Sequence, residues 1–305
     1  MPLHSLCALT TAAAAGAAAA VGGGGGQLPS TSAKPPVLNT ASPPTTDHFP
    51  LPLPDLPAHV KEKIVSLEVM GVDAGRALAL NPALRAASLA SIHSIISYLL
   101  SKGIHHKDLP RILGMCPMIL TASVRADLAP VFAFLSRDLG VPDSEFRRVV
   151  NMCPRLLASS VRDQLKPALI YLQRLGFGDV RALAYQEPVL LVSSVERTLI
   201  PKLQYLVGLG MEKEEAVGLV LRFPGLFTFS IDRNFKPKYE YFVGEMRGRL
   251  EELKKFPQYF AFSLEKRIKP RHEQLRERGL SVPLAVMLKS TDEEFKELIE
   301  KSTQQ

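Results

Sequence analysis

The chain has 305 residues, of which 46% are hydrophobic and 22% charged, and its formal net charge is +7. This length supports one sizeable core or about two domains of average size. Three cysteines are too few for a disulfide framework, and the positive charge favours a polyanionic partner.

The first 50 residues differ in composition from the rest of the chain. Residues 12–26 are almost entirely alanine and glycine, residues 30–50 are rich in serine, threonine and proline, and the only charged residues are Lys34 and Asp47. An acid-poor segment of this kind is typical of organelle transit peptides, and the lack of arginine favours a plastid over a mitochondrion. We therefore expect a disordered transit peptide over residues 1–50. A secretory signal peptide and a plain disordered tail are the alternatives.

Pairs of prolines recur along the rest of the chain, and the second proline of each pair lies 13 residues after the first. The pairs are Pro117 and Pro130, Pro154 and Pro167, Pro188 and Pro201, Pro224 and Pro237, and Pro257 and Pro270. They recur every 33 to 37 residues, and a sixth copy keeps Pro82 but has Ile95 in the second position. A period of this length predicts a solenoid of stacked units, with the array spanning residues 51–281.

Each unit is predicted to be a helix, a proline turn and a second helix. Apolar residues such as Leu128, Phe132 and Leu135 follow the i, i+4, i+7 spacing of one helical face around the second proline. The first proline closes the preceding helix, and apolar residues after it predict a tucked turn. Most of the second helices end at a glycine that supplies a left-handed cap. These glycines are Gly103, Gly140, Gly176, Gly210 and Gly279, while Gly244 is only roughly in register.

The charge is unevenly distributed along the array. Residues 229–271 hold eleven basic and six acidic residues, a net charge of +5, whereas residues 272–305 hold five basic and seven acidic ones. Residues 282–305 lack the proline pair, and we expect them to form a polar helical cap that shields the open end of the solenoid. A basic block before an acidic cap favours a polyanionic partner.

Basic residues recur near the start of the second helix of each unit, which makes them the candidate nucleic-acid-binding residues. They are Arg125, Arg162, Lys166, Arg197, Lys202, Arg233, Lys236, Lys238, Arg267, Lys269 and Arg271. Cations at a helix start oppose the helix dipole, so they contribute little to helix stability. Stacking would arrange them as a stripe that could follow a phosphate backbone. The alternative is solvated surface charge paired with the adjacent acids, which are Asp127, Asp163, Glu196, Asp232 and Glu265.

Catalytic and metal-binding motifs are missing from the sequence. The histidines are scattered, and the glycine run at residues 22–26 lacks the Gly-Lys-Ser/Thr ending of a phosphate loop. Cys116 and Cys153 each precede a first proline and are expected to be small buried residues, not metal ligands or a disulfide pair. We therefore expect no enzymatic activity and no cofactor.

Four segments carry a family resemblance. Met115-Cys-Pro-Met-Ile-Leu, Met152-Cys-Pro-Arg-Leu-Leu, Arg222-Phe-Pro-Gly-Leu-Phe and Lys255-Phe-Pro-Gln-Tyr-Phe, each followed by a second proline and a helix, resemble the repeats of the mitochondrial transcription termination factor (mTERF) family. Residues 256–272 are similar to the C-terminal repeat of plant organellar members. The resemblance covers about residues 60 to 300. It implies an all-α solenoid of about six to seven repeats, a left-handed superhelix with a basic concave groove for nucleic acid.

The resemblance implies a factor in organelle gene expression. We expect a monomer that binds double-stranded DNA or structured RNA, has no membrane partner and resides in the chloroplast, with the mitochondrion as an alternative or additional site. Transcription termination is the expected role, and RNA maturation, by intron splicing or tRNA processing, is the alternative. Two rivals are a pentatricopeptide-type RNA-binding array, which keeps a stricter period, and a protein-binding scaffold, which would not need the basic residues.

Overall fold

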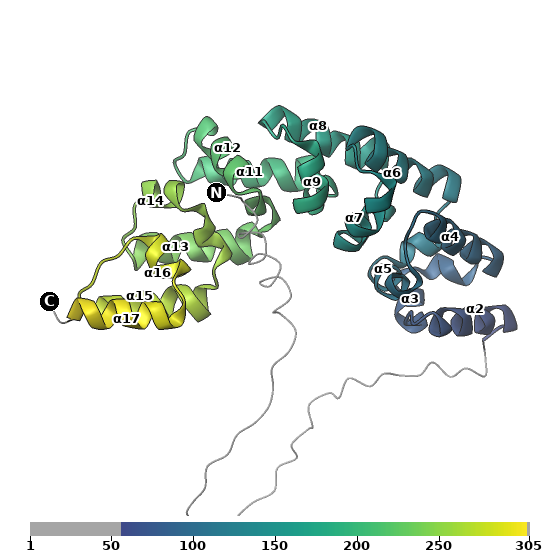
Figure 1. Ribbon diagram of the computed structural model, residues 1–305, viewed down its shortest axis with the longest axis horizontal. Helices are drawn as coiled ribbons and strands as arrows, with labels where there is room; N and C mark the ends of the chain where they lie inside the picture. Colours follow the sequence, from purple (N-terminus) through teal and green to yellow (C-terminus); the bar gives the residue numbers. More distant parts are fainter. Residues whose placement is uncertain (1–55, 304–305) are drawn as a thin grey trace, which may run out of the picture.

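The computed structural model describes residues 56–303 as an array of short helices, with no strand in that range (Figure 1). The predicted all-α solenoid is therefore confirmed. The array curves into an arch from α2 (Ala58–Val69) at one end to α17 (Asp292–Thr303) at the other (Figure 1). The predicted transit peptide over residues 1–50 and the first residues of the predicted array lie outside the described residues.

Each complete repeat has three parts, a first helix, a short turn helix that begins at the first proline, and a long last helix. The first helices are α3 (Ala74–Leu80), α5 (Leu109–Met115), α7 (Phe146–Met152), α9 (Val180–Gln186), α12 (Lys213–Arg222) and α14 (Leu250–Lys255). The turn helices are Pro82–Arg85, Pro117–Thr121, Pro154–Ala158, α10 (Pro188–Leu191), Pro224–Thr228 and Pro257–Ala261. The predicted proline turn is thus itself a helical turn.

The last helices are α4 (Leu89–Ser101) and five helices that begin with a wider turn. These five are Val124–Leu128 with α6 (Ala129–Ala133) and Phe134–Asp138, Val161–Leu165 with α8 (Lys166–Leu175), Val195–Leu199 with α11 (Ile200–Gly208), Ile231–Phe235 with α13 (Lys236–Gly244), and Leu264–Ile268 with α15 (Lys269–Glu277). Short turns at His106–Asp108 and Asp143–Glu145 precede α5 and α7. After α15 come α16 (Leu284–Lys289) and α17, which have no turn helix between them.

The two kinds of helix lie on different sides of the arch. In the N-terminal half, α5, α7 and α9 lie along the inner side, and α4, α6 and α8 lie outside them (Figure 1). Towards the C-terminal end, α12 and α14 lie on the outer side in this view, so the array twists as it curves. Each repeat also contacts the next, as α4 does with the turn helix Pro117–Thr121.

The core runs through the whole array without a break. The predicted apolar face of the last helices is buried, with Leu128 and Leu135 fully inaccessible and Phe132 only 2% exposed. Five of the six turn helices are anchored by their third and fourth residues, such as Ile119 and Leu120, which are also buried, whereas Pro82–Arg85 buries only its third residue, Leu84. The prediction of a tucked apolar turn is therefore confirmed, and burial of both elements joins neighbouring repeats.

The second proline shapes the start of each last helix. In all five helices that contain it, the backbone N–H two residues before the proline bonds the carbonyl five residues back, as from Leu128 to Ser123 at 3.1 Å. This π turn widens the helix where a proline ring would crowd an ordinary α turn. The repeat with Ile95 supplies the comparison, because α4 starts with the ordinary bond from Ile92 to Ser88 at 3.2 Å.

The helix ends and the two cysteines of the array have the conformation and burial that the sequence predicts. The five predicted glycine caps all have positive φ angles, from 65° to 108°. Gly244 does not, and Arg247 takes the left-handed conformation there with φ of 52°.

Cys116 and Cys153 are buried free thiols, and burial raises the pKa of both. Among residues 56–303, no helix is long and apolar enough to cross a membrane.

Candidate nucleic-acid interface

A serine caps the start of every last helix. In the five wide-turn helices the serine Oγ accepts the backbone N–H three residues further on, at 3.1 to 3.2 Å. The capping residues are Ser123, Ser160, Ser194, Ser230 and Ser263, and Ser88 does the same for α4. The protein itself therefore satisfies one of the free N–H groups at each helix start that we expected to face a phosphate.

The arginines that the sequence predicts as one column do not occupy equivalent positions in their repeats. Counted from the capping serine, Arg125 and Arg162 stand in the second position, Arg197 and Arg233 in the third, and Arg267 in the fourth. Successive residues of a helical turn point in different directions, so these side chains fan around the helix start. Counting from the first proline obscured this, because the serine lies at a constant six residues from that proline and the arginine does not.

Six of the eleven candidate residues are exposed, and they remain predicted ligands. They are Arg125, Arg162, Lys166, Arg197, Arg233 and Lys236. The Lys166 Nζ lies 3.5 Å from a carboxylate oxygen of Asp138, and the Lys236 Nζ lies 2.5 Å from one of Asp232. Both ion pairs are exposed to solvent, so each contributes little to stability. The four arginine side chains form no ion pair with any residue between 56 and 303.

The other five candidates are at least partly buried and bonded within the protein, and two of them, Lys238 and Arg271, are too buried to belong to the predicted surface stripe. Lys238 is 6% exposed and its Nζ donates to the carbonyl oxygen of Phe260 at 2.6 Å. Arg271 is 4% exposed and donates to the carbonyl oxygen of Met287 at 2.6 Å and to Asp292 at 2.5 Å. The remaining three are Lys202, which donates to Phe227, Arg267, which donates to Leu288 at 2.9 Å, and Lys269, which pairs with Glu265 at 2.6 Å.

Lys202, Lys238 and Arg271 share one place in the repeat, immediately after the second proline. Each reaches across to the carbonyl end of the next turn helix or, for Arg271, to the end of α16. We call this contact the carbonyl clamp. The two preceding repeats have the buried apolar residues Val131 and Ala168 in this place. Burial lowers the pKa of Lys238 to about 8, so the buried ammonium is held at some electrostatic cost.

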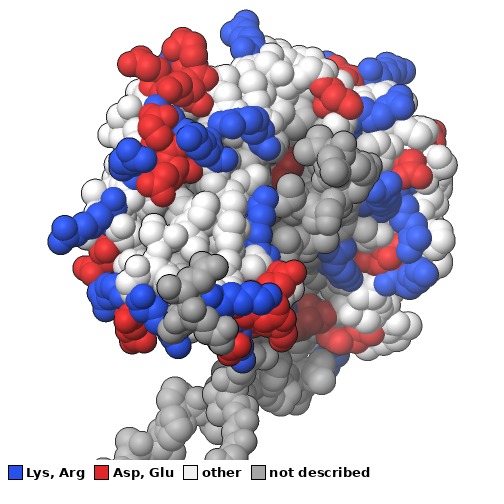
Figure 2. All heavy atoms as spheres, turned by 60° about the vertical axis from the view of Figure 1, so that its left-hand side comes forward, with Lys and Arg blue, Asp and Glu red and all other residues white. Residues whose placement is uncertain are grey.

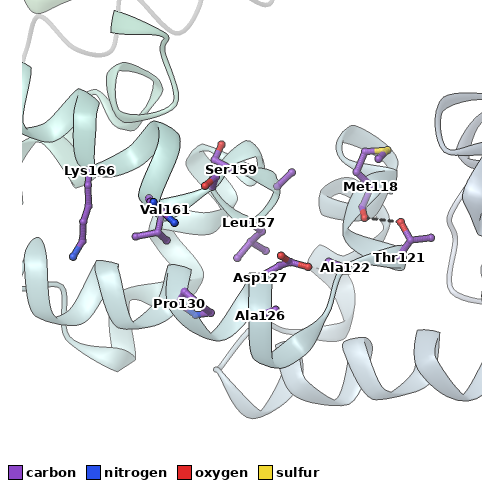
Figure 3. Close-up of a pocket in the computed structure, with 13 residues that line it drawn as sticks. Met118, Thr121, Ala122, Ala126, Asp127, Pro130, Leu157, Ser159, Val161 and Lys166 are labelled. Atoms are coloured by element: carbon purple, nitrogen blue, oxygen red, sulfur yellow. Dashed lines mark hydrogen bonds between the residues drawn. The ribbon is translucent and has the colours of Figure 1, made fainter.

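A first groove lies between the second and third repeats, near two exposed candidates. It has a volume of about 790 Å³ and is lined by Arg162, Lys166 and Asp127, among others. Lys166 stands at one end and Met118 with Thr121 at the other, with Asp127 and Pro130 between them (Figure 3). The groove therefore combines two cations with one acid and an apolar floor, a composition that suits backbone contact more than a chemical reaction.

A second groove, which the sequence interpretation missed, lies between the first helices α5 and α7. It has a volume of about 690 Å³, and its lining includes Arg111, Arg147 and Arg148. Arg147 pairs with Asp108 across the two repeats at 2.6 Å, which lowers the pKa of that carboxyl. Arg148 is exposed, and its guanidinium lies 5.1 Å from the Tyr185 ring centre and 3.7 Å from the Glu145 carboxylate, while the exposed Arg111 donates to the Asn151 carbonyl oxygen. The signal in the sequence was an arginine six residues before the first proline.

That position forms a row across three stacked repeats, which we call the arginine row. It consists of Arg76 on α3, Arg111 on α5 and Arg148 on α7, all exposed. Two of the helices that carry this row, α5 and α7, lie on the inner side of the arch in its N-terminal half (Figure 1). On the face turned forward in Figure 2, basic and acidic side chains are interspersed.

Comparison with known families agrees with this repeat architecture. The mTERF family model matches the chain twice in tandem, over residues 59–181 and residues 178–296. Together the two matches cover the array from α2 to the middle of α17 and therefore include both grooves.

Proposed function

The chain belongs to the mTERF family of nucleic-acid-binding factors in organellar gene expression, and from this premise we propose that it acts in transcription termination. The family is one of regulators and not of known enzymes, and the residues described hold no cluster of His, Cys, Asp and Glu suited to a metal ion. We propose the chloroplast as its site of action, with the mitochondrion as the alternative, on the composition of residues 1–50.

The arginine row is the observation that carries the proposal. Three exposed arginines occupy the same place in three stacked repeats, so they recur in series along the N-terminal half of the array, where α5 and α7 lie on the inner side of the arch. A nucleic-acid backbone also presents its phosphates in series, and guanidinium groups bind phosphate in a planar, two-pronged geometry. The exposed cations around the serine caps, such as Arg162 and Lys166, would extend contact to the backbone beyond this row.

Binding alone supplies a mechanism for termination. Displacement of counterions from the phosphates gives affinity, and the curved shape of the array gives contact over several repeats. A protein held in this way on a template or a transcript would obstruct the advancing polymerase. No side chain needs to break a covalent bond in this mechanism.

The first experiment measures nucleic-acid affinity of the full chain at several salt concentrations. Replacing Arg76, Arg111 and Arg148 together by glutamine should reduce the slope of log affinity against log salt by about 2 to 3, since each lost phosphate contact contributes about 0.7 to 0.9. The matched control replaces Arg137, Arg174 and Arg278, which are also exposed but lie off the row. An unchanged slope in the first variant, with the fold intact, would argue against the proposed interface.

The role is tested by crosslinking and immunoprecipitation from isolated organelles, with sequencing of both the DNA and the RNA recovered. Enrichment of a discrete duplex site at the 3′ end of a gene supports termination. Enrichment of introns or tRNA precursors without a DNA peak assigns the protein to RNA maturation instead. Complexes that survive nuclease and high salt would identify a protein-binding scaffold.

A further inference from the structure

An exposed apolar row runs beside the arginine row. Leu80 on α3, Met115 on α5 and Met152 on α7 all stand two residues before the first proline of their repeats. Their exposed fractions are 53%, 53% and 41%, which is unusual for large apolar side chains that recur in one place. None of them contributes to the core that joins the repeats.

The two rows lie on one face. On each of the three helices the apolar residue follows the arginine by four positions, as Met115 follows Arg111, so both point the same way about 6 Å apart along the helix. α3 packs against α5, and the groove between α5 and α7 is lined by Arg111, Arg148 and Met152. The face therefore presents guanidinium groups along one edge and apolar groups along the other.

This chemistry is confined to the first three repeats. In the next three, the place of the arginine is taken by Ala182, Gly218 and Glu251, and the place of the apolar residue by Gln186, Arg222 and Lys255. The later repeats share the same fold, so the repeat architecture does not require an exposed Leu or Met there. The paired rows are a property of the surface of α3, α5 and α7.

We propose that α3, α5 and α7 bind an unpaired strand of nucleic acid, with Arg76, Arg111 and Arg148 on its phosphates and Leu80, Met115 and Met152 against its bases. In a duplex the faces of the bases are stacked on one another, so an apolar row would meet only sugars and charged phosphates. An unpaired strand exposes its base faces for contact with side chains. Methionine sulfur also packs favourably on aromatic rings.

The repetition of the face fits this assignment. Each of the three helices offers one arginine and one apolar residue, and other helical-repeat proteins read an unpaired strand with one base for each repeat. A protein partner is the competing occupant, but it would have to match a row of three cations with a row of acids. The proposal rests on the proposed function, because it names the form of nucleic acid that this face takes.

The test compares the full chain with a variant in which Leu80, Met115 and Met152 are replaced by serine. The probes are fluorescently labelled oligonucleotides of randomised sequence, as single-stranded RNA, as single-stranded DNA and as duplex DNA. The matched control replaces Ile170, Val207 and Val243 by serine, since these are exposed to 47%, 37% and 46% but lie on the last helices. All six side chains are exposed, so neither variant removes core packing.

We expect the first variant to lose about tenfold in affinity for single strands and no more than about twofold for the duplex, with the control unchanged. A stronger effect on RNA than on single-stranded DNA identifies a transcript as the source of the strand, and the reverse identifies opened duplex. Equal losses on all probes, or no loss on any, overturn the proposal and leave the apolar row to a protein partner. Salt-sensitive binding by the unmodified chain would still support nucleic-acid binding, on which the proposed function depends, and binding of no probe would contradict both.

Discussion

Glu187 is a carboxyl in a place that four other repeats fill with an apolar or thiol side chain. It directly precedes Pro188, where the corresponding residues are Cys116, Cys153, Phe223 and Phe256, and the first repeat has the buried amide Asn81 there. It lines a pocket of about 260 Å³ between the fourth and fifth repeats. Burial raises its pKa to about 7 from the ordinary value of 4.5, because the charged form is poorly solvated there.

We predict that the Glu187 carboxylate destabilises the fold at high pH. Its folded-state pKa is raised, so below pH 4.5 the group is neutral in both states, and between pH 4.5 and 7 the unfolded state alone becomes charged. Above pH 7 the full penalty applies, about 2 to 3 kcal/mol after allowance for partial exposure. Glu187→Gln should therefore raise the free energy of unfolding by about that amount at pH 8.

The measurement is denaturant unfolding of both proteins across this pH range. The two curves should converge below pH 4.5 and separate as pH rises to 7. Glu240→Gln is the control, because Glu240 is exposed and its replacement should leave the pH dependence of unfolding unchanged. A Glu187→Gln protein that is less stable than the unmodified one at pH 8 would show that the carboxylate has a stabilising partner.

The helix caps show which local features can be predicted from the sequence and which cannot. The five glycine caps were predictable because a left-handed residue at a helix end favours glycine. Arg247 was not, since nothing in its side chain indicates a positive φ, and only the missed register of Gly244 pointed to a different ending. The serine caps could have been predicted, because a serine stands six residues after the first proline in all six repeats, including the one at Pro82.

At the scale of elements, the carbonyl clamp explains why the predicted binding residues divide into two groups. Sequence alone shows only that Lys236 and Lys238 flank Pro237. The helix turns one of them to solvent and the other into the junction with the next turn helix, where the Phe260 carbonyl oxygen accepts a hydrogen bond from the Lys238 ammonium. A long cationic side chain can serve either place, so composition cannot distinguish them.

We predict that removal of the buried cation leaves nucleic-acid binding unchanged. Lys238→Met should keep the affinity and its salt dependence, because the Lys238 ammonium is 6% exposed and bonded to Phe260. Arg233→Gln, one turn earlier and exposed, should reduce the slope of log affinity against log salt by about 0.7 to 0.9. Both variants are measured at a temperature where circular dichroism shows an intact fold. A larger loss of slope for Lys238→Met than for Arg233→Gln would place the lysine on the binding surface.

The second proline shows how far an element can be predicted. The helical spacing of apolar residues on either side of Pro130 was sufficient to predict the helix. The π turn was not predicted, because its hydrogen bonds skip one residue without any change in the apolar spacing. Within the same protein, α4 shows the helix start without this proline. It has Ile95 in place of the proline and begins as an ordinary α-helix.

For the whole molecule, stability depends on contacts between neighbours. Each repeat packs only on the next, so a terminal unit is held from one side and needs a cap. α16 and α17 fill that place, and Arg271 anchors them through the Met287 carbonyl, Ser290 and Asp292. These two helices resemble the first and last helices of a further repeat that lacks the proline turn between them.

We therefore predict that removal of residues 282–305 loosens only the neighbouring repeat. The guanidinium of Arg271 would lose the carbonyls of Met287 and Ser290, and α15 would lose its packing against α16. Amide hydrogen exchange should accelerate by about tenfold or more in Pro257–Ala261 and α15, while α4 and α5 stay as protected as in the full chain. Equal acceleration along the whole array would mean that it unfolds as one cooperative unit, and that coupling extends well beyond nearest neighbours.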